Sequence, residues 1–298
     1  MPELPEVETV RRGLAPVLVG QKFHKVVTRR ADLRFPFPDN FSIRLEGQAI
    51  EALNRRAKYL LAHLSGGEIL VMHLGMSGRF VIAPPANDKG GRRSRPGQFV
   101  RDTGYKPQHD HVIFEMADGG SVTYNDARRF GFMLLVAADS LDEHRLFCRL
   151  GPEPLGNTFN AEMLASAARG RKCDLKAFLM DQRVVAGLGN IYVCEALYRA
   201  GLKPGRCAAT LSGKAGKPLA RCEHLVGAIR SVLRDAIAVG GSSLRDYRQT
   251  DGSLGYFQHR FAVYGREGQP CSSPLCDGII RRKVDAGRST FYCPRCQK

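Results

Sequence analysis

Four cysteines near the end of the chain have the residue type and the spacing of a metal site. Cys271 and Cys276 enclose four residues, Cys293 and Cys296 enclose two, and sixteen residues separate the two pairs. Two close pairs around a hairpin-length stretch supply four thiolates for a tetrahedral Zn²⁺ ion, as in zinc ribbons. Ordinary thiols or two disulfides are the alternative at this point. Because four protein ligands close the coordination sphere, we predict one structural zinc ion and expect other groups to carry the chemistry.

The first residues of the chain, MPELPE, place proline and glutamate where most chains carry little. Apolar residues recur from Leu4 at helical spacing, and Pro5 suits a first helical turn. Glu6 would face the positive end of the helix dipole, whereas we expect Glu8 to face solvent. Pro16 should end or bend this helix. The sequence therefore predicts a helix that holds the acidic start of the chain in place.

The charge of the chain indicates its partner. A formal net charge of +16 over 298 residues argues for a polyanion, with nucleic acid ahead of an acidic membrane surface. No stretch approaches the roughly 18 apolar residues of a membrane helix, and the start has no basic region leading into an apolar one. The five remaining cysteines are scattered singly, as reduced thiols are. We expect a cytosolic protein without a secretory signal.

Two kinds of local pattern divide the chain. From about residue 22 to 135, short β-like runs alternate with turns, which predicts an all-β sandwich or barrel. GPEPLG at 151–156 indicates a boundary, and helical patterns follow up to a Gly-Gly pair at 240–241. β-like runs return from about residue 257. Residues 84–108 are rich in Gly, Pro, Arg and Lys, and we expect a mobile basic loop there.

These pieces resemble the formamidopyrimidine-DNA glycosylase family, in register from residue 1 to 298. The motifs that carry the resemblance are MPELPEVETVRRGL (1–14), RRAKYLL (55–61), HLGMSG (73–78), NDARRFG (125–131), LGPEPL (150–155), GLGNIY (187–192) and RSTFYCPRCQK (288–298). The resemblance implies a bacterial base-excision-repair enzyme for duplex DNA. Such an enzyme removes oxidised purines, chiefly 8-oxoguanine and formamidopyrimidines, and then cleaves the strand by β,δ-elimination as an abasic-site lyase.

The family fold implies an α+β chain with three segments. A β-sandwich flanked by helices would occupy 1–136, a helix–two-turn–helix domain 151–243, and a zinc-finger hairpin 258–298. The resemblance also implies a monomer in the bacterial cytosol. The chain departs from the family in two places. The first cysteine pair encloses four residues where two are usual, which leaves the local turn in doubt, and the 84–108 loop is longer than expected.

The resemblance places the chemistry at the start of the chain. A strand-cleaving glycosylase needs an amine that can form an imine at the sugar C1′. Pro2 matches this nucleophile once Met1 is removed, because behind Met1 its nitrogen is an inert amide. Glu3 matches the acid/base that protonates the sugar ring oxygen. Glu6 would hold the amine in place, unless it only complements the helix dipole. Lys58 matches a lysine that contacts the DNA phosphate or the damaged base near the active site.

An enzyme that acts on a stacked base must flip it out and fill the void. Met76, Arg128 and Phe130 match the family's void-filling residues, although composition alone would place Met76 and Phe130 in the core. The phosphate-contacting positions match His73, Asn190 and Arg288. Residues 241–257 resemble the flexible loop that closes over the flipped base.

Two other functions compete with this one. The sister glycosylase for oxidised pyrimidines, endonuclease VIII, usually has Gly where this chain has Leu4 and lacks the RRFG motif in this form. A zinc-ribbon DNA-binding protein without catalysis fits the charge and the cysteines equally well. It leaves the adjacent Pro2 and Glu3 unexplained.

Overall fold

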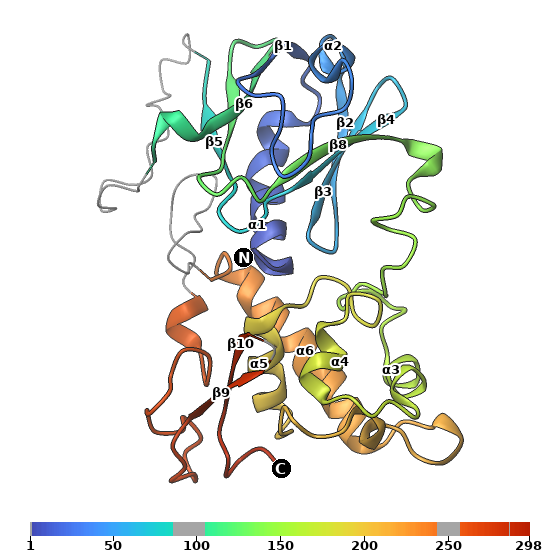
Figure 1. The fold of residues 1–298 in the computed structure, drawn as a ribbon, viewed down its shortest axis with the longest axis vertical. Coiled ribbons are helices and arrows are strands. Elements are labelled where there is room, and N and C mark those ends of the chain that lie inside the picture. Colours follow the sequence, from blue (N-terminus) through green and yellow to red (C-terminus); the bar gives the residue numbers. More distant parts are fainter. Residues whose placement is uncertain (1, 86–104, 243–256, 286) are drawn as a thin grey trace. The chain divides into compact units, whose positions relative to one another are not determined.

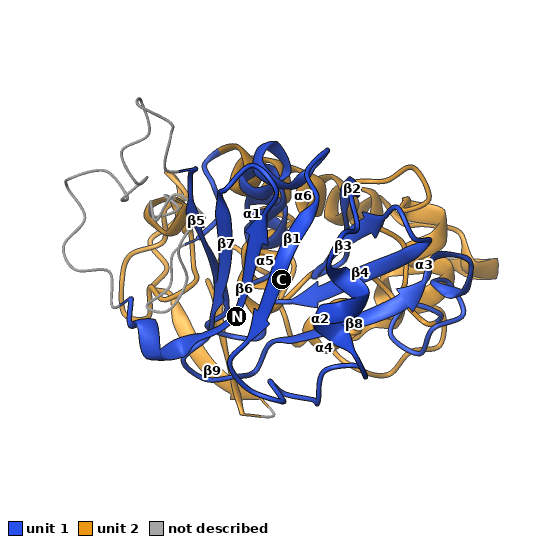
Figure 2. Ribbon diagram, turned by 90° about the horizontal axis from the view of Figure 1, so that it is seen from above, with its two compact units in different colours: residues 1–148, 239–256 blue, residues 149–238, 257–298 orange. Residues whose placement is uncertain are grey.

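The computed structural model describes residues 2–85, 105–242, 257–285 and 287–298 (Figure 1). The chain forms two compact units, shown in different colours in Figure 2. Unit 1 comprises residues 1–148 and 239–256, and unit 2 comprises residues 149–238 and 257–298. Strands dominate unit 1 and helices dominate unit 2, so the chain is an α+β protein. Within the described ranges, no helix is both long enough and apolar enough to span a membrane.

Unit 1 contains two four-stranded antiparallel sheets. One has the strand order β1-β6-β7-β5 and the other β2-β3-β4-β8. Their bounds are β1 Phe23–Thr28, β2 Ile50–Arg56, β3 Tyr59–Leu64, β4 Glu68–His73, β5 Arg79–Ala83, β6 Asp110–Met116, β7 Ser121–Asn125 and β8 Phe132–Ala137. Apolar residues of both sheets and of the first helix form one core. This confirms the predicted β-sandwich with flanking helices.

The first helix, α1 (Leu4–Leu18), forms where the apolar spacing predicts it. Its N-terminus has a capping box between Glu3 and Glu6, which satisfies backbone N–H groups that have no partner within the helix. Its buried face, which includes Val7, Val10 and Leu14, belongs to the core of unit 1. Pro16 lies inside the helix, which ends two residues later at Leu18.

Three elements of unit 1 have weak sequence patterns. Helix α2 (Phe41–Leu45) is a short turn with two buried residues, and β5 lies next to the basic stretch at 84–108. Strand β2 reads IEALNRR, and most of its side chains are charged or partly exposed. The stronger runs match β3, β4, β6, β7 and β8. A strand buried on both faces is nearly continuously apolar and a strand with one buried face alternates, so both kinds are visible in the sequence.

Unit 2 is a small helical core with a β-hairpin. Its helices are α3 Ala161–Ala168, α4 Leu175–Met180, α5 Asn190–Arg199 and α6 Ala220–Ala238, and its strands are β9 Arg281–Asp285 and β10 Arg288–Tyr292. Short 3-10 helices occur in unit 2 at Ala208–Leu211, Lys214–Gly216 and Phe257–Arg260, and in unit 1 at Pro107–His109 and Ala138–Ser140. Asn160 and Asp174 cap α3 and α4 through backbone N–H groups three residues on. Helix α5 is buried over most of its length and forms the centre of the unit.

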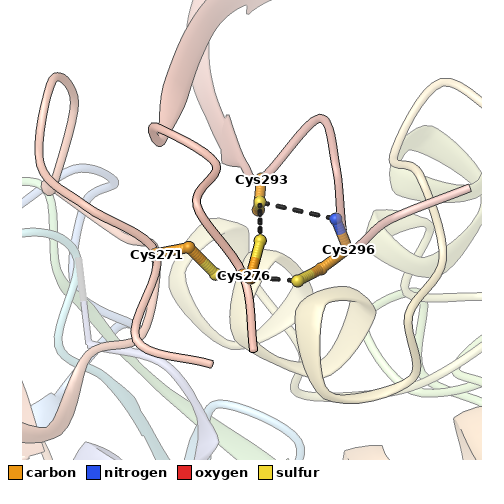
Figure 3. A group of neighbouring side chains, drawn as sticks. All are labelled: Cys271, Cys276, Cys293 and Cys296. Atoms are coloured by element: carbon orange, nitrogen blue, oxygen red, sulfur yellow. Dashed lines mark hydrogen bonds between the residues drawn. The ribbon is translucent and has the colours of Figure 1, made fainter. Parts of the chain in front are cut away.

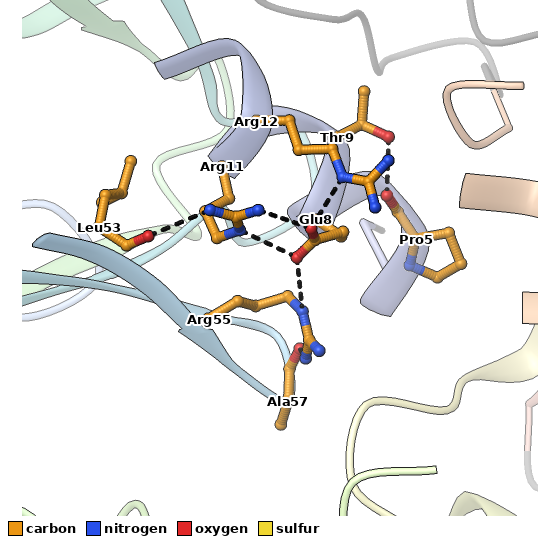
Figure 4. A network of polar contacts seen from close by, with 8 residues as sticks. All are labelled: Pro5, Glu8, Thr9, Arg11, Arg12, Leu53, Arg55 and Ala57. Carbon is orange, nitrogen blue, oxygen red and sulfur yellow. Dashed lines mark hydrogen bonds and ion pairs between the residues drawn. The ribbon is translucent and has the colours of Figure 1, made fainter. Parts of the chain in front are cut away.

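Glu8 does not face solvent, so this expectation is wrong. Its side chain is only 13% exposed, and its carboxylate accepts hydrogen bonds from Arg11 and Arg12 of α1 and from Arg55 of β2 (Figure 4). Arg55 also donates to the carbonyl of Ala57 at 2.9 Å. The carboxylate of Glu8 therefore ties the first helix to the turn that follows β2.

We predict that Glu8→Gln destabilises unit 1 in a pH-dependent way. Burial alone would raise the pKa of Glu8, but hydrogen bonds from Arg11 and Arg12 and the charge of Arg55 lower it below its usual 4.5. A lowered pKa contributes stability above the usual value, and this contribution is lost as pH falls through the folded-state pKa. The variant should therefore lose about 1–2 kcal/mol of unfolding free energy at pH 7.

Urea denaturation at pH 7 and near pH 4 measures this effect. The difference between wild type and variant should shrink at the lower pH. Glu51→Gln, which alters an exposed carboxylate on β2, is the matched control and should have little effect. An equal difference at both pH values would mean that the ion pairs of Glu8 do not stabilise the fold.

Candidate active site and nucleic-acid interface

Pro2 and Glu3 lie buried immediately before and at the cap of α1. The N–H of Glu3 donates to Glu6 Oε2 at 2.8 Å. Glu6 Oε1 accepts two more hydrogen bonds, from the N–H of Ser242 at 2.8 Å and from its Oγ at 3.0 Å. A Cβ at Gly241, whose φ is +77°, would lie 2.9 Å from Glu6 Oε1. Glu6 thus accepts a hydrogen bond from the backbone N–H next to Pro2, and it also anchors residue 242.

Lys58 and His73 lie at one end of the sheet β2-β3-β4-β8. Lys58 follows Ala57, which has a left-handed φ of +52° in the turn between β2 and β3. Its side chain is buried, whereas a lysine in such a turn is usually solvated. Tyr59 pairs with His73 across β3 and β4, and His73 pairs with Phe132 of β8. The strand register therefore places a buried lysine beside a histidine.

His73 is a neutral hydrogen-bond donor at neutral pH. The N–H of Gly75 donates to its Nδ1 at 3.1 Å, so Nδ1 is an acceptor and Nε2 carries the proton. Burial, followed by the positive charges of Lys58 and Arg34, lowers the pKa of His73 to about 4. Its ring stacks on Phe132 with centroids 5.1 Å apart, which fixes its direction. The Nε2–H group can thus donate to an anion without a change of charge.

Two turns of unit 1 carry Met76, Arg128 and Phe130. Neither Met76 nor Phe130 belongs to the core of the unit, in contrast to what composition suggests. Met76 is half-buried, Arg128 is exposed, and Phe130 is 42% exposed. The guanidinium of Arg128 lies over the Phe130 ring, 4.8 Å from its centroid. An arginine and an aromatic ring are therefore held together at the surface, where they can contact another molecule.

In unit 2, the side chain of Asn190 bonds to Ser289, the residue that directly follows Arg288. Asn190 is the first residue of α5, and its Nδ2 donates to the carbonyl of Ser289 at 2.9 Å. Arg288 directly precedes Ser289 and is exposed after Gly287, whose φ is +74°. A helix N-terminus beside an exposed arginine is suited to bind a phosphate.

Lys176 is a functional candidate that the sequence did not reveal. Its side chain is 4% exposed, and its Nζ donates to Thr290 Oγ1 at 2.6 Å and to the Ser289 carbonyl at 3.2 Å. Burial lowers the pKa of Lys176. Ser289 thereby accepts bonds from both Lys176 and Asn190, so a lysine of α4 helps to hold the hairpin beside α5. The one hint was a single lysine within the apolar stretch LKAFLM.

The four C-terminal cysteines converge as predicted (Figure 3). Their Sγ atoms all lie within 4.8 Å of one another, with 3.7 Å between Cys271 and Cys296 and 3.6 Å between Cys276 and Cys293. Sulfur atoms around zinc, each about 2.3 Å from the ion, would be about 3.8 Å apart in a tetrahedron. A disulfide would bring two of them to about 2.05 Å. The geometry fits a metal ion and excludes disulfides.

The wider first cysteine pair does not prevent the site from closing. The N–H of Cys271 donates to the carbonyl of Gly278 at 2.8 Å, so the chain folds back after Cys276. A Cβ at Gly278 would lie 2.8 Å from Cys293 Sγ and 3.1 Å from Cys276 Sγ. Only glycine fits beside the sulfur atoms at this position, and the doubt about this turn is thereby resolved.

Some of the features predicted from the sequence lie outside the residues that the structure describes. Met1, residues 86–104 of the 84–108 stretch and residues 243–256 of the 241–257 loop lie outside the described residues. The other candidates fall on both units. Unit 1 holds Pro2, Glu3, Glu6, Lys58, His73, Met76, Arg128 and Phe130, and unit 2 holds Asn190, Arg288 and the four cysteines.

Three family models match the chain in succession. They are the formamidopyrimidine-DNA glycosylase N-terminal domain over residues 1–133, the formamidopyrimidine-DNA glycosylase H2TH domain over 150–248, and a zinc finger found in FPG and IleRS over 268–298. Together with the four convergent sulfur atoms, the last match establishes one structural zinc ion.

Similar proteins match over their full length. Formamidopyrimidine-DNA glycosylases of Azorhizobium caulinodans and Bradyrhizobium diazoefficiens are 59% and 56% identical to this chain, with 100% of both chains covered in each comparison. The crystal structure of the MutM (FPG) protein from Thermus thermophilus is 40% identical, with a TM-score of 0.81 over 99% of this chain and 98% of that one. The Lactococcus lactis Fpg in complex with DNA containing an abasic site is 32% identical, with a TM-score of 0.81 over 99% of each chain.

We predict that removal of zinc unfolds the hairpin and leaves the sheets of unit 1 intact. The small core around the hairpin consists of Cys194, Val263, Cys271, Ile280, Phe291 and Cys293, and two of these six residues are zinc ligands. So few apolar side chains cannot order the segment without the metal. Hydrogen exchange after chelation should show loss of amide protection in β9 and β10, while β3 and β4 stay protected. A hairpin that keeps its protection would show that the metal is dispensable.

Proposed function

The chain belongs to the formamidopyrimidine-DNA glycosylase family, and from this premise we propose that it removes oxidised purines from duplex DNA and cleaves the strand at the resulting abasic site. The substrates are 8-oxoguanine and formamidopyrimidines. The observation that carries the proposal is the buried start of the chain, where Pro2 and Glu3 are buried and Glu6 fixes the N–H of Glu3. A non-catalytic DNA-binding protein has no need of this arrangement.

Pro2 is the nucleophile in this proposal. After removal of Met1, its secondary amine attacks the sugar C1′, and the damaged base leaves with the electrons of the glycosidic bond and takes up a proton. An N-terminal amine, with a pKa of about 7.7–8.0, is far more often deprotonated at neutral pH than a lysine at about 10.4. The iminium that forms carries its positive charge without a proton. It accepts electrons as the C2′ proton is removed and the 3′ phosphate, then the 5′ phosphate, is expelled.

Glu3 and Glu6 have different roles beside the nucleophile. Glu3 donates a proton to the ring oxygen as the sugar opens and assists the later proton transfers. Glu6 is a positioning residue, supported by its hydrogen bond from the Glu3 N–H. A fixed amine matters because nucleophilic attack needs the reacting atoms about 3–3.5 Å apart and aligned.

The DNA contacts are proposed for the remaining residues. Lys58 binds the phosphate or damaged base beside the active site, while the phosphate contacts are His73, Asn190 and Arg288. Met76, Arg128 and Phe130 fill the void left by the flipped base, with Arg128 donating to the orphaned cytosine. The functional segments are 1–136 for catalysis, 151–243 for DNA binding and 258–298 for the zinc hairpin.

We also propose that the protein works as a monomer in the bacterial cytosol, where the chromosome lies. The bacterial sources of its relatives support this location. Light scattering during gel filtration tests the assembly and should give a mass near 32.9 kDa. A dimer mass would refute the monomer without affecting the enzymatic proposal.

Borohydride trapping tests the nucleophile. Mature protein, with loss of Met1 verified by intact mass, should form a covalent adduct with a duplex containing an abasic site, and protein that retains Met1 should form none. Glu3→Gln should still be trapped on the abasic site, because the sugar there already exists partly as an open aldehyde. The same variant should excise 8-oxoguanine at least about 100-fold more slowly, the usual scale of a lost general acid.

The absence of an adduct with mature wild-type protein would sink the enzymatic proposal. A lesion panel then separates the two glycosylases. Release of 8-oxoguanine opposite cytosine, without release of thymine glycol, is the expected outcome. The opposite preference would identify the endonuclease VIII type.

The phosphate contacts make a prediction of their own. Lys58→Gln and Arg288→Ala should each weaken DNA binding and reduce the slope of log K against log salt by about 1, because each removes one phosphate neutralised by the protein. Arg199→Ala is the matched control, since Asp235 already neutralises that arginine at 2.6 Å. Fluorescence anisotropy with an abasic-site duplex at several salt concentrations measures the slopes. An unchanged slope for Arg288→Ala would exclude it from the phosphate contacts.

A further inference from the structure

A buried aspartate joins the two turns that carry the void-filling side chains. Asp126 is completely buried, and its carboxylate accepts four hydrogen bonds. Oδ1 accepts from Ser77 Oγ at 2.5 Å and from the N–H of Arg128 at 3.2 Å. Oδ2 accepts from the N–H of Gly131 at 2.9 Å and from the Tyr124 hydroxyl at 3.2 Å. Ser77 belongs to the turn of Met76, and the other donors belong to β7 and to the turn after it.

The same two turns also pack backbone against backbone. A Cβ at Gly75 would lie 2.3 Å from the nitrogen of Gly131. Similarly, a Cβ at Gly78 would lie 2.3 Å from the hydroxyl of Tyr124, and a Cβ at Gly131 would lie 1.8 Å from it. Side chains at these positions would force the turns apart. The glycines of HLGMSG and NDARRFG are therefore explained by the contact between the two motifs.

The backbone of Asp126 is fixed as firmly as its side chain. Its N–H donates to the carbonyl of His109 at 3.0 Å, and its own carbonyl accepts from His111 Nε2 at 2.8 Å. Arg129 donates to the same carbonyl at 3.3 Å and has a left-handed φ of +55°. The carboxylate therefore extends from a rigid part of the sheet and can impose its position on both turns.

We propose that Asp126 is a positioning residue which, through Ser77, locks Met76 and the Arg128–Phe130 pair into one preformed wedge. This inference rests on the proposed function and extends it from the residues that enter the DNA to the group that aligns them. Met76 lies one residue before Ser77, and Arg128 lies two residues after Asp126. The three side chains then enter the base stack together. Because they are already ordered, base flipping does not carry the entropic cost of ordering each of them separately.

Only a carboxylate satisfies this set of donors. An ionised Asp presents about four acceptor sites, which equals the number of donors around Asp126. An asparagine would place its NH₂ group against one pair of these donors and lose at least one of the hydrogen bonds that Asp126 accepts. The substitution Asp126→Asn changes neither size nor shape, so it loosens the two turns with little effect on packing.

Two substrates separate positioning of the wedge from a general structural role. Excision of 8-oxoguanine requires a stacked and paired base to be extruded, whereas a preformed abasic site has no base to extrude and depends less on the wedge. Single-turnover rates on both duplexes should show that Asp126→Asn slows excision at least about tenfold, equal to about 1.4 kcal/mol of barrier. In the same variant, the rate of strand cleavage at the abasic site should change by less than about threefold.

Substitutions at Ser77 should have a smaller effect on excision, and one of them should restore the rate. Ser77→Ala should slow excision about threefold or more, and Ser77→Thr, which keeps the hydroxyl, should restore most of the rate. Discrimination between cytosine and adenine opposite the lesion should also fall in Asp126→Asn and Ser77→Ala, because Arg128 loses its fixed position. Asp110→Asn is the matched control. It alters another buried aspartate of unit 1, bonded to Asn125 and Tyr105, and should leave the ratio of the two rates unchanged.

The outcomes distinguish this inference from the function on which it rests. Equal losses on both substrates, or no loss in either variant, would overturn the positioning role while wild-type excision still supports the glycosylase. If Asp126→Asn does not fold, the Ser77 pair decides the question alone. Wild-type protein that fails to excise 8-oxoguanine yet cleaves the abasic site would instead refute the proposed substrate.

Discussion

A carboxylate removed from water is tolerated only where donors of the chain replace the lost hydration. The N-terminal arrangement depends on this constraint at Glu6. This side chain is 2% exposed and accepts hydrogen bonds from the N–H of Glu3 and from both donors of Ser242. The donors come from opposite ends of unit 1 in sequence. As a result, one buried charge fixes the direction of the chain directly after Pro2, which a frayed terminus could not achieve.

Buried carboxylates that accept hydrogen bonds from donors of the chain occur at two other places, and both position functional side chains. Asp126 collects donors from the turns of Met76 and Phe130. In unit 2, Glu195 of α5 is 2% exposed and accepts from three consecutive N–H groups, those of Ala262, Val263 and Tyr264, at 2.8–3.0 Å. The hydroxyl of Tyr264 in turn lies 3.4 Å from Asn190 Nδ2. Each carboxylate thus converts an irregular segment into a rigid one through backbone donors.

Sequence patterns predicted the parts of the fold whose origin is local. The strands β3 and β8, the helices of unit 2 and the four cysteines depend on spacing within a short window, and the structure contains them where they were expected. The environment of polar residues depends instead on distant partners. Glu8 was expected to face solvent: two of its partners, Arg11 and Arg12, are local, but the third, Arg55, lies 47 residues further on. Lys176 bonds to Thr290 across 114 residues. Periodicity holds no information about such pairs.

There is a physical reason why the sequence reveals the role of some residues and not of others. Side chains proposed to contact DNA, such as Arg128, Phe130 and Arg288, are exposed and are recognisable by their type within a motif. An exposed arginine tolerates many neighbours, because water satisfies whatever the protein does not. A buried carboxylate such as Asp126 tolerates one set of donors, since each unpaired donor costs about 1–3 kcal/mol. The donors around a buried carboxylate such as Asp126 are therefore strongly constrained by the structure, and the residue type alone does not indicate them.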